Sequence, residues 1–223
     1  DLIGSREVPE SALYGVQTLR GIENFRISKF HLNEYPLFIQ ALAITKMGAA
    51  IANRELDLLT KEQTDAILKA CKEILEGKYH DQFPVDMIQG GAGTTTNMNA
   101  NEVIANRALE LMGHQRGEYQ YCSPNDHVNR SQSTNDAYPT AIHIGLYYTH
   151  LKLVKHFETL IQSFRKKGEE FANIIKMGRT QLEDAVPMTL GQTFNGFASI
   201  LEHEVKNLSL IHISEPTRLD VIS

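Results

Sequence analysis

The feature that most constrains the fold is a long apolar repeat in the middle of the chain. Between about residues 137 and 174, apolar side chains recur at steps of three and four, which lines one face of an α-helix. A helix of roughly 35 residues would be about 50 Å long, which exceeds the usual length in globular domains. The segment therefore predicts a long helical bundle or the core of an oligomer. The repeat consists of Tyr147, Leu151, Val154, Phe157, Ile161 and Phe164.

Shorter helical patterns flank this segment, so the predicted fold class is mainly α. Pro36 suits a first helical residue, and Thr60 to Gln63 has the pattern of a capping box. We expect residues 1–35 to be loop with short extended pieces, and residues 114–134 to be irregular. The complete set of predicted helices is 36–54, 60–76, 97–112, 137–174 and 189–207.

Composition narrows the class of protein. Apolar residues make up 42% of the 223, which is enough for a packed core. The 22 basic and 27 acidic residues give a net charge of −5 with no basic stripe, which argues against a nucleic-acid partner. Cys71 and Cys122 do not form a disulfide framework, so free thiols in a reducing compartment fit better. Without an export leader or an apolar run of about 18 residues, we expect a cytoplasmic protein with no membrane partner.

A stretch rich in hydroxyls and amides, NRSQSTNDAYPT at 129–140, comes directly before the long repeat. Asn135 or Asp136 can cap the predicted helix, and Pro139 suits its first turn. Ser133 and Thr134 then lie at a helix N-terminus, where free N–H groups and the helix dipole favour a carboxylate or phosphate. A polar cap without any ligand is the alternative, and it is the commoner role of such a stretch.

Two more loops carry many donors. QGGAGTTTNMN, at 89–99, puts three glycines and three threonines before a predicted helix, and it lacks the lysine of a nucleotide-binding P-loop. MGRTQLEDAVPMTLGQ, at 177–192, places Arg179, Thr180 and Gln181 between two predicted helices, and Arg179 can pair with its acidic neighbours. A tight glycine turn and a long polar connection are the alternatives. Together the loops suit a small dicarboxylate, because phosphoryl transfer would normally need a metal or a lysine as well.

Other catalytic arrangements fit poorly. Ser133, His127 and Asp136 could form a triad, but no G-x-S-x-G elbow is present. Histidines also recur along the long repeat, yet their spacings of seven and six do not place two metal ligands one turn apart. These histidines are His143, His150 and His156. We therefore expect no metal site.

Three motifs, in this order, resemble the aspartase/fumarase superfamily. They are QGGAGTTTNMNANEVIANRALELMG, EYQYCSPNDHVNRSQSTNDAYPT and MGRTQLEDAVPMTLGQ, and the resemblance covers about residues 1–208. It implies a small, mostly helical N-terminal domain at 1–134 and the first part of a central helical bundle at 135–208. It also implies a homotetramer in which each active site combines motifs from three chains. Residues 209–223 do not continue the resemblance, and we expect them to be a tail foreign to the family.

The resemblance also implies a chemistry and a role for particular residues. In the aspartase branch, L-aspartate loses ammonia reversibly to give fumarate, without a cofactor and through an enediolate that carries two negative charges on one carboxyl group. The matching positions assign Thr94, Ser133 and Thr134 to that carboxylate and Asn135 to the amino group. The remaining positions, near the second carboxylate and the amine, are Thr180 and Gln181.

Two alternatives to an aspartase remain open. Fumarases typically have other residues where this chain has Ser123, Thr134 and Gln181, so all three positions favour aspartase. A non-catalytic assembly fragment is the second alternative, because the family's Gly-Ser-Ser loop with its serine base has no match in these 223 residues. We therefore assign no catalytic residue, expect a chain truncated after about residue 208, and expect it to be inactive by itself.

Overall fold

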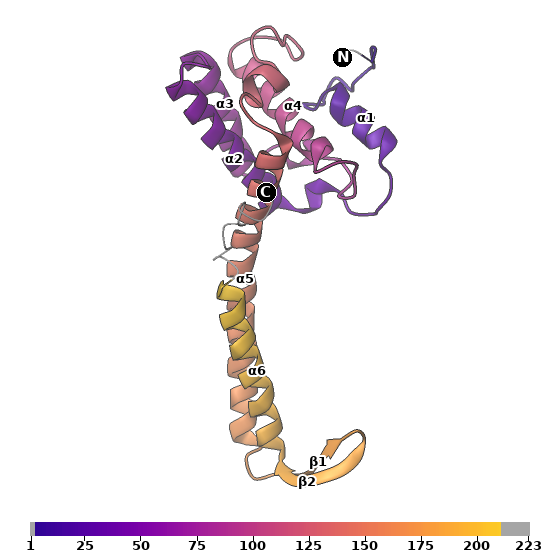
Figure 1. The fold of residues 1–223 in the computed structure, drawn as a ribbon, viewed down its shortest axis with the longest axis vertical. Coiled ribbons are helices and arrows are strands. Elements are labelled where there is room, and N and C mark those ends of the chain that lie inside the picture. Colours follow the sequence, from indigo (N-terminus) through magenta and orange to yellow (C-terminus); the bar gives the residue numbers. More distant parts are fainter. Residues whose placement is uncertain (1–2, 211–223) are drawn as a thin grey trace, which may run out of the picture. The chain divides into compact units, whose positions relative to one another are not determined.

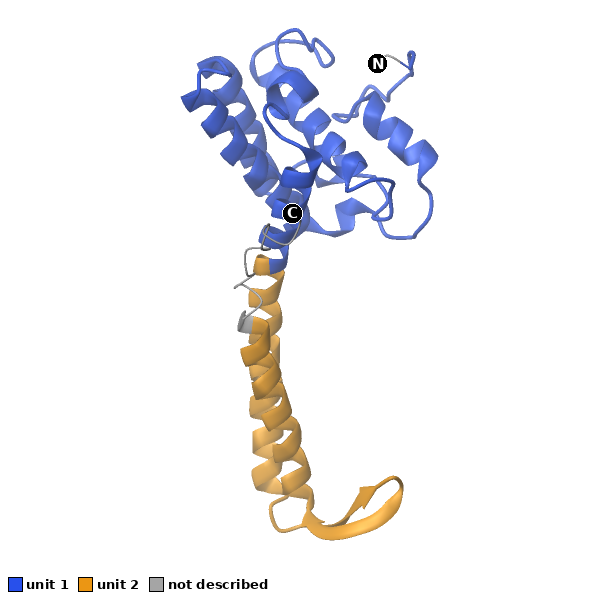
Figure 2. Ribbon diagram, viewed as in Figure 1, with its two compact units in different colours: residues 1–146 blue, residues 147–223 orange. Residues whose placement is uncertain are grey.

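The computed structural model describes residues 3–210, and it confirms the predicted mainly α fold (Figure 1). The chain divides into two compact units, residues 1–146 and residues 147–223 (Figure 2). The predicted domain boundary between residues 134 and 135 remains a prediction. The predicted foreign tail, 209–223, lies outside the described residues except for its first two positions.

Unit 1 contains the helices expected from periodicity. Helix α2 spans Pro36–Glu55, α3 spans Lys61–Leu75 and α4 spans Thr94–Leu111. The predicted capping box is present, because Thr60 Oγ1 accepts from Gln63 N at 3.2 Å and Gln63 Oε1 accepts from Thr60 N at 3.1 Å. The expectation of an irregular segment at 114–134 was nearly right. The exception is one turn of π-helix, Pro124–Val128.

The prediction that residues 1–35 form only loop and extended pieces was wrong. Helix α1 spans Val16–Asn24, followed by a 3₁₀ turn at Leu32–Glu34. Its N-terminus is held by a distant residue, because the buried Glu102 of α4 accepts from Gly15 N and Thr18 N at 2.9 Å each. Gly15 itself has no side chain that could cap the helix. A cap supplied from 84 residues away leaves no local signal in the sequence.

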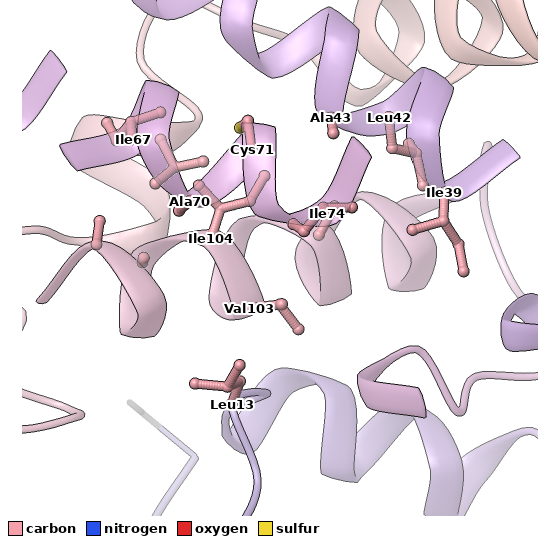
Figure 3. Close-up of a cluster of buried hydrophobic side chains, with 14 of the residues drawn as sticks. Leu13, Ile39, Leu42, Ala43, Ile67, Ala70, Cys71, Ile74, Val103 and Ile104 are labelled. Atoms are coloured by element: carbon pink, nitrogen blue, oxygen red, sulfur yellow. The ribbon is translucent and has the colours of Figure 1, made fainter. Parts of the chain in front are cut away.

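The core of unit 1 lies between α2, α3 and α4 (Figure 3). Ile39 and Leu42 of α2, like Ile67 and Ile74 of α3, are at most 1% exposed. Burying an aliphatic side chain of this size is worth about 1.5–3 kcal/mol, so these faces hold the three helices together. Cys71 lies within this core. Both it and Cys122 are free thiols, as predicted, and both are buried.

Helix α5 spans Thr134–Glu170, so the predicted overlong helix is confirmed with both ends shifted. In unit 2 it is followed by a hairpin of antiparallel strands, β1 at Ile175–Thr180 and β2 at Glu183–Thr189, and then by α6 at Leu190–Leu210. The expected extension of α5 to residue 174 and the polar connection after it were therefore wrong. Alternation in the strands was hard to recognise because both faces of most of the hairpin are exposed.

Among residues 3–210, no helix is at once long enough and apolar enough to cross a bilayer.

Candidate active site

The start of α4 and the start of α5 lie against each other in unit 1. Gly93 precedes α4 with a φ of +83°, a conformation that favours glycine. A Cβ at this position would lie 2.3 Å from Cγ of Tyr138, which belongs to the second turn of α5. Glycine is therefore required twice, for the backbone conformation and for the close approach. The helix begins at Thr94 rather than at Asn97 as predicted, because this glycine turn lets three threonines enter the first turn.

The three threonines of that first turn have different environments. Thr96 is buried, with Gln89 Oε1 accepting from its N–H at 2.8 Å and Gln89 Nε2 donating to its hydroxyl at 2.6 Å. Thr94 is exposed, and Gly93 provides no side chain to accept from the first N–H groups of the helix. The hydroxyl of Thr94 thus lies at an uncapped helix N-terminus, which is a favourable position for an anion.

The N-terminus of α5 is capped by Ser133. Its Oγ accepts from Asn135 N at 3.1 Å, while its own N–H donates to Asp136 Oδ2 at 3.2 Å. The prediction that Asn135 or Asp136 would be the cap was therefore wrong, and Pro139 lies inside the helix instead of in its first turn. The cap uses a lone pair of the Ser133 hydroxyl and leaves its proton available to a ligand.

Thr134 is half-buried, and its side chain belongs to a polar cluster that the sequence did not reveal. Thr134 Oγ1 accepts from Asn97 Nδ2 at 3.3 Å, and the same nitrogen donates to Asn129 Oδ1 at 3.1 Å. Lys46, which is 0% exposed on α2, donates to Asn129 Oδ1 and Gln132 Oε1 at 2.9 Å each. Burial lowers the pKa of Lys46 to about 7. In the sequence, the only indication that Lys46 is buried is its position within the apolar stretch of α2.

The residues of the third loop lie in unit 2. Thr180 and Glu183 pair across the end of the hairpin, and Gln181 and Leu182 form its two-residue turn with φ of 47° and 67°. Thr180 and Gln181 are exposed. Arg179 pairs with Asp184 at 3.5 Å, in agreement with the predicted local salt bridge.

These features define the candidate site within one chain. Two helix N-termini in unit 1 bring Thr94 and the segment 133–135 together, and their exposed hydroxyls offer donors to an anion. The broader surface groove of unit 1 runs past Tyr14 and Arg116 and contains none of these donors. Thr94, Ser133 and Asn135 are exposed to solvent, so these donors can bind a carboxylate but do not exclude water by themselves.

Comparison with known proteins places this arrangement in a family. The model of a family described as lyase matches residues 4–216. The chain belongs to this lyase family. The family resemblance inferred from the three motifs is confirmed. The match to the family model ends at residue 216, a little beyond the expected limit near Leu208.

Individual relatives agree with this assignment. An aspartate ammonia-lyase of Pseudomonas canavaninivorans is 57% identical over 211 residues, which are 95% of this lyase chain and 44% of the relative. The structure of a fumarate lyase:delta crystallin from Brucella melitensis has a TM-score of 0.90 at 50% identity, covering 95% of this chain and 48% of that one. A class II fumarase from Schistosoma mansoni gives 0.82 at 38% identity, with 95% and 45% covered. The lyase chain thus spans less than half the length of these proteins.

Proposed function

We propose that this chain contributes substrate-binding motifs to an aspartate ammonia-lyase, which eliminates ammonia from L-aspartate reversibly to give fumarate. The observation that carries the proposal is the meeting of the α4 and α5 N-termini, with Thr94 exposed at one and Ser133 at the other. Membership of the lyase family and a 57% identical relative with this name support the reaction class.

The proposed role of these donors follows from where charge develops in the reaction. Removing the proton next to the side-chain carboxylate of aspartate moves a second negative charge onto that carboxylate. Thr94, Ser133 and Thr134 donate to it, and the two helix dipoles favour the same charge. A single preorganised donor of this kind is worth about 3 kcal/mol in the transition state. Because these donors lie at the starts of two ordered helices, they need little reorganisation during the reaction.

The other contacts complete the proposed site. Asn135 holds the amino group that leaves, while Thr180 and Gln181 at the hairpin turn bind the second carboxylate and the amine. We propose that the donors of unit 1 come from one copy of the chain and the hairpin turn from another copy, in a cytoplasmic homotetramer. No residue of this chain is assigned as the base, because the serine loop of the family has no match within the 223 residues. The proposed mechanism requires no metal or organic cofactor.

A fumarase is the second candidate, because a class II fumarase also shares this fold. Three positions distinguish the two activities. Ser123 occupies a place where fumarases commonly have histidine, and here its hydroxyl accepts from Asp126 N at 3.1 Å and caps the π-turn. Thr134 and Gln181 also differ from the usual fumarase residues. The 57% identity to an aspartate ammonia-lyase, against 38% to the fumarase, supports the first candidate.

The test uses a chain of the relatives' length that carries this sequence. L-aspartate and L-malate are offered separately, and the ultraviolet absorbance of fumarate is followed. We expect fumarate from aspartate and none from malate. Turnover of malate alone would make the protein a fumarase, and turnover of neither would leave the assembly fragment as the best description.

A further inference from the structure

A continuous series of hydrogen bonds connects the core of unit 1 to the hydroxyl of Thr134. Lys46 Nζ donates to Asn129 Oδ1, which also accepts from Asn97 Nδ2, and the Asn97 amide donates in turn to Thr134 Oγ1. Lys46 is 0% exposed and Asn97 is 1% exposed. The series therefore runs from a fully buried amine to the candidate site.

The orientation of the Asn97 amide is determined by its neighbours. Its nitrogen faces two oxygens, Asn129 Oδ1 at 3.1 Å and Thr134 Oγ1 at 3.3 Å. Asn129 Oδ1 cannot donate, and its own amide nitrogen already donates to Gln132 O at 3.0 Å. Turning the Asn97 amide over would set two carbonyl oxygens against each other and lose the bond to Asn129, while the contact with Thr134 would reverse so that the hydroxyl donates to Asn97.

The loop before α5 is fixed in the same way. Gln132 Oε1 accepts from Lys46 Nζ, and Gln132 Nε2 donates to Val128 O at 2.9 Å. Asn53, which follows Lys46 by two turns on α2, donates from Nδ2 to Arg130 O at 2.9 Å. Lys46 needs only two N–H groups for its two amide acceptors, and both the charged and the neutral amine have them. The position of Asn129 therefore does not depend on the protonation of Lys46.

This geometry has a consequence for the proton of Thr134. A hydroxyl that accepts from Asn97 cannot direct its proton at the same nitrogen, so the proton is left to donate elsewhere. We propose that Asn97 is a positioning residue that keeps the Thr134 hydroxyl a donor toward the substrate carboxylate, with Lys46 and Asn129 holding Asn97 in place. The inference rests on the proposed function, since it gives Thr134 its role in that site.

The test replaces Asn97 in the chain of the relatives' length. Asn97→Asp has nearly the same shape but presents oxygens only, so the Thr134 hydroxyl donates to it and is lost to the substrate. We expect kcat with L-aspartate to fall by about 10- to 100-fold, as for loss of one oxyanion donor, with KM changed by less than about threefold. Asn97→Ala removes the donor without adding charge, so it serves where the aspartate variant does not fold.

A double-mutant cycle distinguishes positioning from general structural support. In a Thr134→Val background there is no hydroxyl to orient, so we expect Asn97→Asp or Asn97→Ala to lower kcat by less than about twofold more. Asn101→Asp is the matched control, because Asn101 is buried one turn along α4 and its amide nitrogen contacts Met98 Sδ instead. We expect this control to change the unfolding midpoint but not kcat.

The outcomes separate the two proposals. A wild-type protein that converts aspartate, together with a full kcat in the Asn97 variants, would overturn the positioning role alone. Additive losses in the cycle would also overturn it, because they would show that Asn97 does not act through Thr134. A wild-type protein that converts no aspartate would overturn the proposed function, and the positioning role with it.

Discussion

The hydroxyl of Ser133 combines a structural and a proposed chemical role, and two substitutions separate them. Ser133→Ala removes the cap of α5, so we expect a loss of about 1 kcal/mol in the free energy of unfolding. It also removes a donor, so the rate with aspartate should fall by about 10- to 1000-fold. Ser133→Asp keeps a good cap but brings a negative charge to the carboxylate, so stability should be retained while activity is lost.

Urea unfolding and fumarate formation, both in the chain of the relatives' length, measure these two effects. Thr134→Val is a second test of the donors, and it should lower the rate over the same range because it also removes a hydroxyl donor. Normal kinetics in Ser133→Asp and Thr134→Val would return the polar stretch before α5 to the role of a helix cap only.

Asp86 provides a residue-scale prediction about acid stability. Its buried carboxylate accepts from Ile27 N, Ser28 N and Ile88 N at 2.9, 2.7 and 2.7 Å, and so joins two loops. Burial alone would raise the pKa of this carboxyl, but the hydrogen bonds outweigh it and lower the pKa from 3.8 to about 2. The stabilisation is therefore complete above pH 3.8 and is lost as the pH falls toward 2.

Thermal unfolding of the wild type and of Asp86→Asn checks this prediction. We expect a clear gap between their midpoints at pH 6, and the gap should close as the pH falls through the window between the two pKa values. A gap that stays constant down to pH 2 would show that the carboxylate charge is not what joins the loops.

The exposed donors were easier to predict from sequence than their supports. Ser133 and Thr134 lie beside a helix start because a polar run followed by an apolar period signals one. Lys46 and Asn97 could not be recognised, because their partners are 83 and 32 residues away in the sequence. A lysine within a helix usually extends into solvent, and only the folded arrangement shows that this one is buried.

At the scale of elements, Gly93 controls how closely α4 and α5 approach. Gly93→Ala meets two penalties, a left-handed backbone worth about 1–2 kcal/mol and crowding against Tyr138 worth about 1–3 kcal/mol more. Gly113 is a matched control, since it has the same φ of +83° and an added Cβ would meet nothing within 4 Å. We expect Gly113→Ala to show the backbone penalty alone.

Urea unfolding gives the free energy of unfolding of both glycine variants. The difference between the two losses is the cost of crowding against Tyr138. Equal losses in both variants would mean that α5 moves away from Gly93 without cost. In that event the contact between the two helix N-termini would not hold the candidate site together.

Elements with a strong local signal were predicted, and those held by distant contacts were not. Helices α2, α3 and α5 were found because their apolar period lies within their own segments, and α3 also has its capping box there. Helix α1 was missed because Glu102 provides its cap from α4. The hairpin was missed because its turn, Gln181 and Leu182, lacks the glycine or asparagine that usually marks two residues with positive φ.

At the scale of the whole molecule, the two units differ in how much core they have. Unit 1 encloses a cluster drawn from α2, α3 and α4. Within the described part of unit 2, Ala198 is the only buried hydrophobic residue. Several rings pack together there, with Phe164 and Phe197 centroids 5.7 Å apart, yet Phe197 remains 48% exposed. A two-helix unit with so small a core depends on further packing partners for its stability.

This imbalance leads to a prediction about self-association. Apolar side chains stay exposed along both helices of unit 2, including Leu151 at 50% and Ile200 at 61%. Many exposed apolar side chains along two helices favour association. We therefore expect the 223-residue chain to form concentration-dependent assemblies or aggregates, visible by light scattering, and to release no fumarate from aspartate.

Ile200→Glu should increase the monomer fraction because it buries a charge in the associated state. Ile51→Glu should not, although Ile51 of unit 1 is also 45% exposed. Equal effects of the two substitutions would mean that association involves the whole surface rather than the helices of unit 2.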